Sequence, residues 1–208
     1  MTINTKTLAA IDIGTNAIRL FISNVEEYPT ETLFKKIAFL RVPIRLGEDV
    51  FTTGEIGQQK GKRLCETMQG FSYIMSAFNV ESYKAYATCA MREARNGKSV
   101  AEQIQKECDL NIEIISGTKE AETIFAGGMN EVVDDDKTYL YVDVGGGSTE
   151  VIVYSKSVKV EACSFPLGTV RMLNDAMDET LQKMVEKHHR KIYPGCHYRV
   201  GRKYQQDS

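Results

Sequence analysis

The sequence predicts an α/β protein built from two related halves. Strand-length apolar runs alternate with helix-length amphipathic segments, which is the pattern of helices packed on a sheet. One four-residue motif also occurs twice, as Ile11-Asp12-Ile13-Gly14 and as Val142-Asp143-Val144-Gly145. An apolar segment precedes and follows each copy. The two halves are therefore expected to share a strand–turn–strand unit.

The first half begins with three predicted strands. Residues 8–13 form an apolar run that stops at Gly14-Thr15-Asn16, and residues 17–23 resume an apolar pattern that is compatible with a strand. Residues 31–45 alternate loosely between apolar and polar side chains. This alternation predicts a third strand, followed by a loop at Arg45-Leu46-Gly47.

Helices and strands then alternate. From residue 57 onward, apolar side chains recur at steps of three and four, which predicts a long amphipathic helix. They are Leu64, Met68, Phe71, Met75 and Phe78. Residues 83–87 and 111–115 are expected to be strands, and 91–108 one or two helices interrupted near Asn96-Gly97. A helix starting about Thr118 leads toward the second motif, and a further strand covers 151–153.

The composition excludes several classes of protein. The chain has 208 residues, of which 42% are hydrophobic and 26% charged, and its net charge of -2 provides no global field to attract nucleic acid or anionic lipid. No apolar run approaches the roughly 18 to 20 residues that a membrane span requires. Residues 1–6 are polar, unlike a signal peptide. We expect a cytoplasmic protein without a nucleic-acid or membrane partner.

Each repeated motif places an aspartate at the end of a strand, directly before a glycine turn. Glycine permits positive φ and close approach, so several backbone N–H groups can face a ligand beside the carboxylate. Such a turn suits a phosphate together with Mg²⁺, and Thr15, Asn16, Ser148 and Thr149 can add side-chain donors. A single copy would more readily be an ordinary hairpin turn. Two copies favour a phosphate site.

Six stretches carry a more specific signal through their order and spacing. They are DIGTNAIRL at 12–20, RLGE at 45–48, ATCAMREA at 87–94, ISGTKEA at 115–121, VDVGGGSTE at 142–150 and FPLG at 165–168. Together they resemble the exopolyphosphatase and guanosine-pentaphosphate phosphohydrolase (Ppx/GppA) family, from about residue 8 to about residue 175. The resemblance implies an actin-like, duplicated ribonuclease-H-type fold with two lobes.

The resemblance also implies an activity, the Mg²⁺-dependent release of terminal phosphate from inorganic polyphosphate or guanosine pentaphosphate. Glu120 matches the family's general base, which activates the attacking water, and Asp143 would hold Mg²⁺. Phosphoryl transfer needs a positioned nucleophile and neutralised charge more than covalent chemistry from the protein. The remaining matched residues would bind phosphate along the cleft. They are Asp12, Gly14, Thr15, Asn16, Arg19, Arg92, Gly145, Gly146, Ser148 and Glu150.

The residues taken alone leave other interpretations open. Glu120 could simply stabilise the first turn of its helix by about 0.3 to 1 kcal/mol. Arg19 could face solvent from a strand, and Arg92 could be a cation on a helix surface. Two other functions use the same turns. One is a non-hydrolytic module that binds an alarmone or nucleotide, and the other is an ATP-dependent kinase of the actin-like fold.

The resemblance divides the chain into a first lobe at 1–125 and an incomplete second lobe at 126–208. The tail from about 194 is basic and polar and carries no family pattern. One hypothesis is a frameshift, because permitted codons for 194–207, read with one base deleted after Pro194, encode an apolar strand entering a glycine turn. The coding DNA tests this against a natural divergent tail. A truncated lobe would weaken catalysis and expose apolar surface, which predicts self-association such as a homodimer.

Overall fold

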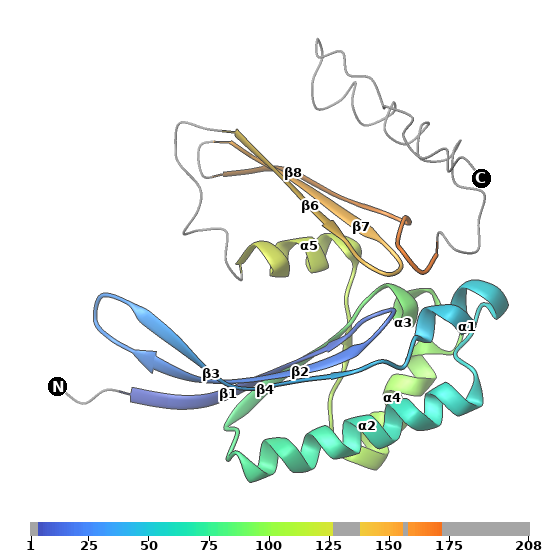
Figure 1. Cartoon of the computed structure of the whole chain (residues 1–208), viewed down its shortest axis with the longest axis horizontal. Coiled ribbons are helices and arrows are strands. Elements are labelled where there is room, and N and C mark those ends of the chain that lie inside the picture. Colours follow the sequence, from blue (N-terminus) through green and yellow to red (C-terminus); the bar gives the residue numbers. More distant parts are fainter. Residues whose placement is uncertain (1–3, 127–137, 156–157, 172–208) are drawn as a thin grey trace, which may run out of the picture. The chain divides into compact units, whose positions relative to one another are not determined.

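The computed structural model describes residues 4–126, 138–155 and 158–171 (Figure 1). All of them lie in one compact unit, Met1–Asp175. The alternation of strands and helices confirms the predicted α/β class. In chain order the elements are β1 (Asn4–Ile13), β2 (Ile18–Glu27), β3 (Thr32–Val42), α1 (Leu46–Thr53), α2 (Gln58–Ala77), β4 (Ser82–Ala87), α3 (Cys89–Glu93), α4 (Gly97–Cys108), β5 (Glu113–Ile114), α5 (Gly117–Ala126), β6 (Thr138–Val144), β7 (Thr149–Ser155) and β8 (Val158–Phe165).

The first sheet has five strands in the order β3-β2-β1-β4-β5. β1, β2 and β3 form an antiparallel meander, whereas β4 and β5 extend the other edge in parallel. β1 therefore lies at the centre, and Ile11 and Ile13 at its carboxyl end are buried in the core. The residues that follow Ile13 therefore lie at the middle of the end of the sheet where β1 and the parallel β4 finish.

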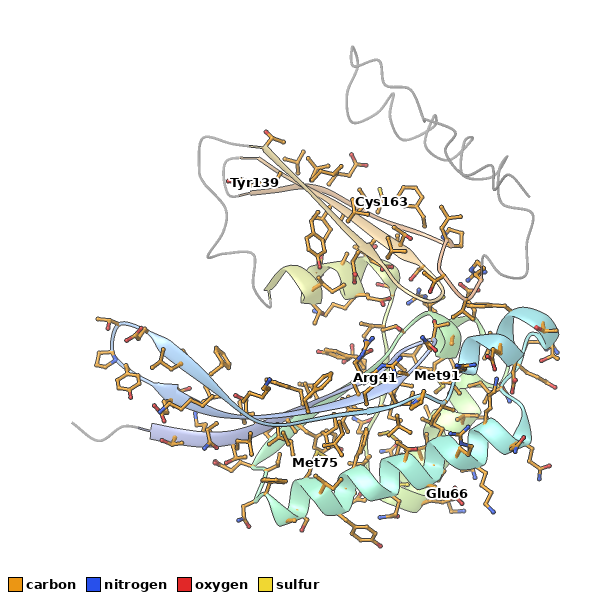
Figure 2. The ribbon with its side chains drawn as sticks, in the orientation of Figure 1. Arg41, Glu66, Met75, Met91, Tyr139 and Cys163 are labelled. Atoms are coloured by element: carbon orange, nitrogen blue, oxygen red, sulfur yellow. The ribbon has the colours of Figure 1, made fainter. Side chains whose placement is uncertain are left out.

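Helices α2 and α4 cover one face of this sheet (Figure 1). The predicted apolar stripe of α2 is confirmed for Leu64, Met68, Phe71 and Met75, which are buried in the same core as β1. Figure 2 shows Met75 pointing from α2 toward the sheet. The prediction was wrong for Phe78, which follows the last residue of the helix and is exposed.

The second sheet repeats the opening of the first. β6, β7 and β8 form an antiparallel meander, like β1, β2 and β3. The two hairpin turns close with the same hydrogen bond: Gly14 N donates to Ala17 O at 3.2 Å, and Gly145 N donates to Ser148 O at 2.9 Å. The predicted repeat is therefore a structural one. In the two turns Ser148 occupies the place of Ala17, and Gly146 and Gly147 occupy the places of Thr15 and Asn16.

One face of the second sheet is covered by α5. Ala121 of α5 and Ile152 of β7 are buried against each other. On β6, Leu140, Val142 and Val144 are each at least half exposed. Among the described strands, β6 pairs only with β7, whereas β1 pairs with both β2 and β4.

The division at 125 and 126, the homodimer and the cytoplasmic location stay predictions, and the tail from about 194 lies outside the described residues.

Two elements were not predicted from the sequence, α1 and β8. The loop predicted at Arg45-Leu46-Gly47 is wrong from Leu46 onward, because residues 46–53 form a short helix that follows Arg45 in the left-handed region and has no side-chain cap to announce it. β8 was not assigned, although residues 158–165 alternate in the manner of a strand. No helix in the described part of the chain is long and apolar enough to cross a membrane.

Candidate active site

A pocket of about 510 Å³ is lined by residues from both repeated turns and from α5. It contains every predicted site residue except Arg92, which lines a smaller neighbouring cavity. The predicted residues in the lining are Asp12, Gly14, Thr15, Asn16, Arg19, Glu120, Asp143, Gly145, Gly146, Ser148 and Glu150. Their roles remain predictions, but residues from both halves of the chain come together in one place.

The two turns meet in direct contact at Thr15. A Cβ on Gly147 would lie 2.7 Å from Thr15 Oγ1 and 2.6 Å from Cys89 Sγ, and a Cβ on Gly146 would lie 3.2 Å from Thr15 Cβ. A side chain at 147 would therefore collide with both neighbours. Among the described glycines only Gly54 has a positive φ. The turn glycines are needed for close approach, and the part of our expectation that invoked positive φ was wrong.

The first hairpin carries an ion pair inside the pocket. Asp12 and Arg19 stand opposite each other in the β1–β2 register, and Arg19 Nη1 lies 2.6 Å from Asp12 Oδ2. Burial raises the pKa of Asp12 and the charge of Asp143 raises it further, while Arg19 opposes both effects. Arg19 is thus half exposed yet bound to a pocket carboxylate, so it is not simply a solvent-facing side chain.

The second hairpin carries two carboxylates at the matching positions. Asp143 and Glu150 stand opposite each other in the β6–β7 register. Glu150 is almost completely buried and accepts a hydrogen bond of 2.8 Å from Ser164 Oγ of β8. The duplicated scaffold therefore holds a balanced pair in one half and like charges in the other.

Glu120 reaches the pocket because of how α5 begins. Ser116 Oγ accepts the N–H of Lys119 at 3.1 Å and so caps the helix. A Cβ on Gly117 would lie 2.5 Å from Ser164 Oγ, so only glycine lets the start of α5 pack this closely on β8. Ala121 then faces the second sheet, and the preceding residue, Glu120, faces the pocket.

The surroundings of Glu120 favour its neutral form. Burial and the charge of Glu150 raise the pKa of Glu120 to about 7, against the lowering effect of Arg92. Arg92 Nη1 lies 3.3 Å from Glu120 Oε2 and also donates to Ile115 O at 2.8 Å. The stabilisation of about 0.3 to 1 kcal/mol that a helix N-terminus offers a carboxylate is outweighed at Glu120 by burial and by the charge of Glu150. A carboxyl group that ionises near neutral pH suits a general base.

The carboxylates of the pocket suit a Mg²⁺ ion that is bound by one or two of them together with waters and substrate phosphates. Asp12, Glu120, Asp143 and Glu150 all line the pocket, and their mutual repulsion contributes to the raised pKa values of Asp12 and Glu120. Among the described residues no three acidic, histidine or cysteine side chains form a metal cage. Mg²⁺ is usually held by one or two carboxylates, with waters and substrate phosphates completing its shell. The donor set suits that arrangement.

The pocket extends beyond the predicted residues over the face of the first sheet. Phe21 and Lys84 stand opposite Ala10 in the register of their strands, and Phe39 stands opposite Phe21. All four line the pocket. Side chains two apart on a strand share a face, so Ala10 lies on the face of Asp12 and Phe21 on that of Arg19. This periodicity could have revealed the extension.

Comparison with known proteins now decides the family. The family model described as the Ppx/GppA phosphatase family matches residues 21–192. The chain belongs to this family. A bifunctional 3-dehydroquinate synthase/phosphatase of Fusobacterium nucleatum is 32% identical over 79% of the chain and 25% of that protein. Exopolyphosphatase 2 of Mycobacterium tuberculosis is 28% identical over 79% of the chain and 53% of that protein.

A solved structure confirms the fold that the resemblance implied. The crystal structure of an exopolyphosphatase from Cytophaga hutchinsonii matches with a TM-score of 0.73 at 28% identity, over 90% of this chain and 60% of that one. With the repeated hairpins, this match establishes the duplicated α/β fold of the Ppx/GppA family. The chain spans about a quarter of the length of the first of these two relatives and about half of the length of the second.

Proposed function

We propose that this protein hydrolyses phosphoanhydride bonds and releases the terminal phosphate of inorganic polyphosphate or guanosine pentaphosphate in the presence of Mg²⁺. The observation that carries the proposal is the position of Glu120, a carboxyl group with a pKa of about 7, in the same pocket as both glycine turns. Membership of the Ppx/GppA family supports the reaction class.

Glu120 acts as the general base in this proposal. Its carboxylate accepts a proton from the water that attacks the terminal phosphorus, and Arg92 holds the carboxylate in place through the contact at 3.3 Å. Because Arg92 is itself held by Ile115 O, the base has little freedom to turn away. A fixed nucleophile is the main requirement of phosphoryl transfer.

The turns bind phosphate through the N–H groups that remain after each turn has closed. Gly14 N and Gly145 N donate within their own turns. Phosphate oxygens are therefore left to the N–H groups of residues 15 and 16 in the first turn and 146–148 in the second. Gly14 and Gly145, which were predicted to bind phosphate, instead shape the turns in this proposal.

Positive charge for the phosphate chain comes from several sources. Arg19 and Lys84 line the same pocket, and Arg92 adjoins it. We propose that Asp143 holds Mg²⁺, which when bound neutralises charge on the phosphate oxygens. The pocket's extension over β2, β3 and β4 leaves room for a chain of phosphates or for a nucleoside beyond the terminal phosphate.

Phosphate release tests the proposal directly. Tripolyphosphate, long-chain polyphosphate and guanosine pentaphosphate are each supplied with Mg²⁺ to the wild-type chain, to Glu120→Gln and to Glu102→Gln, an exposed residue on α4 that serves as the control. We expect release by the wild type and by Glu102→Gln, and at least a hundredfold loss in Glu120→Gln. The ratio of kcat/KM between the substrates then assigns the preferred one.

Three other outcomes would contradict the proposal. Absence of phosphate release from every substrate by the well-folded wild type would remove the hydrolase. Tight binding without turnover, unchanged in Glu120→Gln, would indicate a nucleotide-binding or alarmone-binding module. ADP formation that depends on a second substrate would indicate a kinase.

A further inference from the structure

Arg171, which follows β8, joins the second glycine turn to the first half of the chain. Its Nε donates to Gly147 O at 2.9 Å, and its Nη2 lies 2.6 Å from both carboxylate oxygens of Glu93 on α3. The guanidinium carbon also lies 4.2 Å from the centre of the Phe51 ring on α1. The Arg171 side chain is only 19% exposed. One side chain thus bridges three separate elements.

The segment around Arg171 fixes the orientation of the whole turn. Thr169 N donates to Gly145 O at 3.0 Å, and Val170 N donates to Gly146 O at 2.8 Å. With the contact from Arg171 to Gly147 O, three successive carbonyls of the turn are held by residues 169–171. In a planar trans peptide the N–H points away from the C=O. Holding these carbonyls therefore directs the N–H groups of residues 146–148 the opposite way.

The same contacts tie the turn to the proposed base. Glu93, which binds Arg171, is the neighbour of Arg92 on α3, and Arg92 binds Glu120. α3 is a short helix anchored by its buried Cys89, Ala90 and Met91, the last two of which pack in the core of the first sheet. Two adjacent side chains on this anchor thus lead to the phosphate-binding turn on one side and to Glu120 on the other.

We infer that Arg171 is a positioning residue that holds the turn at 145–148 against α3 and thereby sets the distance between the bound terminal phosphate and Glu120. The inference rests on the proposed function for its catalytic consequence, but the clamp itself is a property of the described contacts. No contact of Arg171 with substrate is required.

Arginine is suited to this position and lysine is not. The planar guanidinium can donate through Nε to a carbonyl while another nitrogen binds a carboxylate, and its face can stack on an aromatic ring. A lysine ammonium has donors at a single point. Arg171→Lys therefore keeps the charge beside Glu93 but loses the contact with Gly147 O, which separates positioning from charge.

The experiment compares Arg171→Ala, Arg171→Lys and Glu93→Gln with the wild-type chain. Arg95→Ala is the matched control, because Arg95 also contacts a glutamate, Glu55, but lies on the surface away from the turn. Three properties are measured for each: hydrogen exchange of residues 145–150, binding of tripolyphosphate with Mg²⁺, and kcat and KM for its hydrolysis. Thermal unfolding reports on folding.

We expect Arg171→Ala to exchange at 145–150 at least tenfold faster, to bind tripolyphosphate about tenfold more weakly, and to lose 10- to 100-fold in kcat. Arg171→Lys should fall between the wild type and Arg171→Ala. The effects of Arg171→Ala and Glu93→Gln should not add in the double variant, because both break the same contact. Arg95→Ala should match the wild type in all three properties.

A lower unfolding temperature with unchanged exchange, binding and kcat in Arg171→Ala would overturn the inference, since a merely structural residue behaves in that way. If Arg171→Ala does not fold, Arg171→Lys and Glu93→Gln decide, and wild-type values in both would overturn it equally. Faster exchange and weaker binding without turnover in the wild type would retain the clamp and remove the hydrolase. Equal turnover by wild type and Arg171→Lys, with unchanged hydrogen exchange at residues 145–150, would retain the hydrolase and remove the clamp.

Discussion

Replacing Glu120 by glutamine should make the protein more stable at alkaline pH while abolishing hydrolysis. Glutamine keeps the length of the side chain and an oxygen that can accept the hydrogen bond from Arg92. What it removes is the negative charge, which in the wild type is buried near Glu150 and Asp12. Residues that favour function at the expense of stability are typical of active sites.

The magnitude follows from the pKa of Glu120. A rise from 4.5 to about 7 corresponds to about 3 kcal/mol, at roughly 1.4 kcal/mol for each pKa unit. Because the pKa is raised in the folded state, the wild type loses this stability as the pH rises from about 4.5 to about 7. Glu120→Gln has no such loss. The stability difference should be near zero at pH 4 and about 2 to 3 kcal/mol at pH 8.

Urea unfolding of both proteins between pH 4 and pH 9 measures this difference. We expect the two stability curves to separate between pH 4.5 and pH 7 and to run parallel above that range. A variant that is less stable than the wild type at pH 8, or a difference that is the same at every pH, would refute the description of Glu120 as a buried carboxylate among like charges.

Three further predictions concern the turns and the pocket. Gly147→Ala should lower the free energy of unfolding in urea by about 1 to 3 kcal/mol, because its Cβ meets Cys89 and Thr15. Gly70→Ala, which has open space around it in the middle of α2, should raise that free energy by about 0.5 to 1 kcal/mol. Equal effects of the two variants would contradict the close approach of the turns. Ser164→Ala should cost about 1 to 3 kcal/mol at pH 8, since Glu150 loses a hydrogen bond, and an unchanged unfolding midpoint would count against that contact. Asp143→Asn should raise the Mg²⁺ concentration needed for half-maximal phosphate release at least tenfold, and chelation should stop release by the wild type; release that survives chelation would remove the metal from the proposal.

The framework of the fold could be predicted because its signals are local. Strand β1, the break between α3 and α4, and the start of α5 each follow from periodicity or from turn residues within the segment. The repeated motif at Asp12 and Asp143 revealed the duplicated hairpins. α1 was not predicted because it is a single short helix without a capping side chain. Its position depends on packing against the turn, which no local pattern records.

The candidate site was predicted in its members but not in its contacts. The family motifs led to Glu120 and to both turns, yet they do not show that Asp12 is paired with Arg19 while Asp143 faces Glu150. These relations depend on the register of the hairpins. Arg171 could not be found from sequence at all, because its three partners come from distant parts of the chain.

The pH dependence of kcat/KM for tripolyphosphate with saturating Mg²⁺ tests most directly whether Glu120 is the base, because kcat/KM reports the pKa values of the free enzyme. Because a base must be ionised to accept a proton, we predict that log kcat/KM rises with a slope of one below about pH 7 and levels off above it. A kcat/KM that stays constant from pH 5 to pH 9, or a Glu120→Gln variant that retains the wild-type rate and profile, would contradict the central claim.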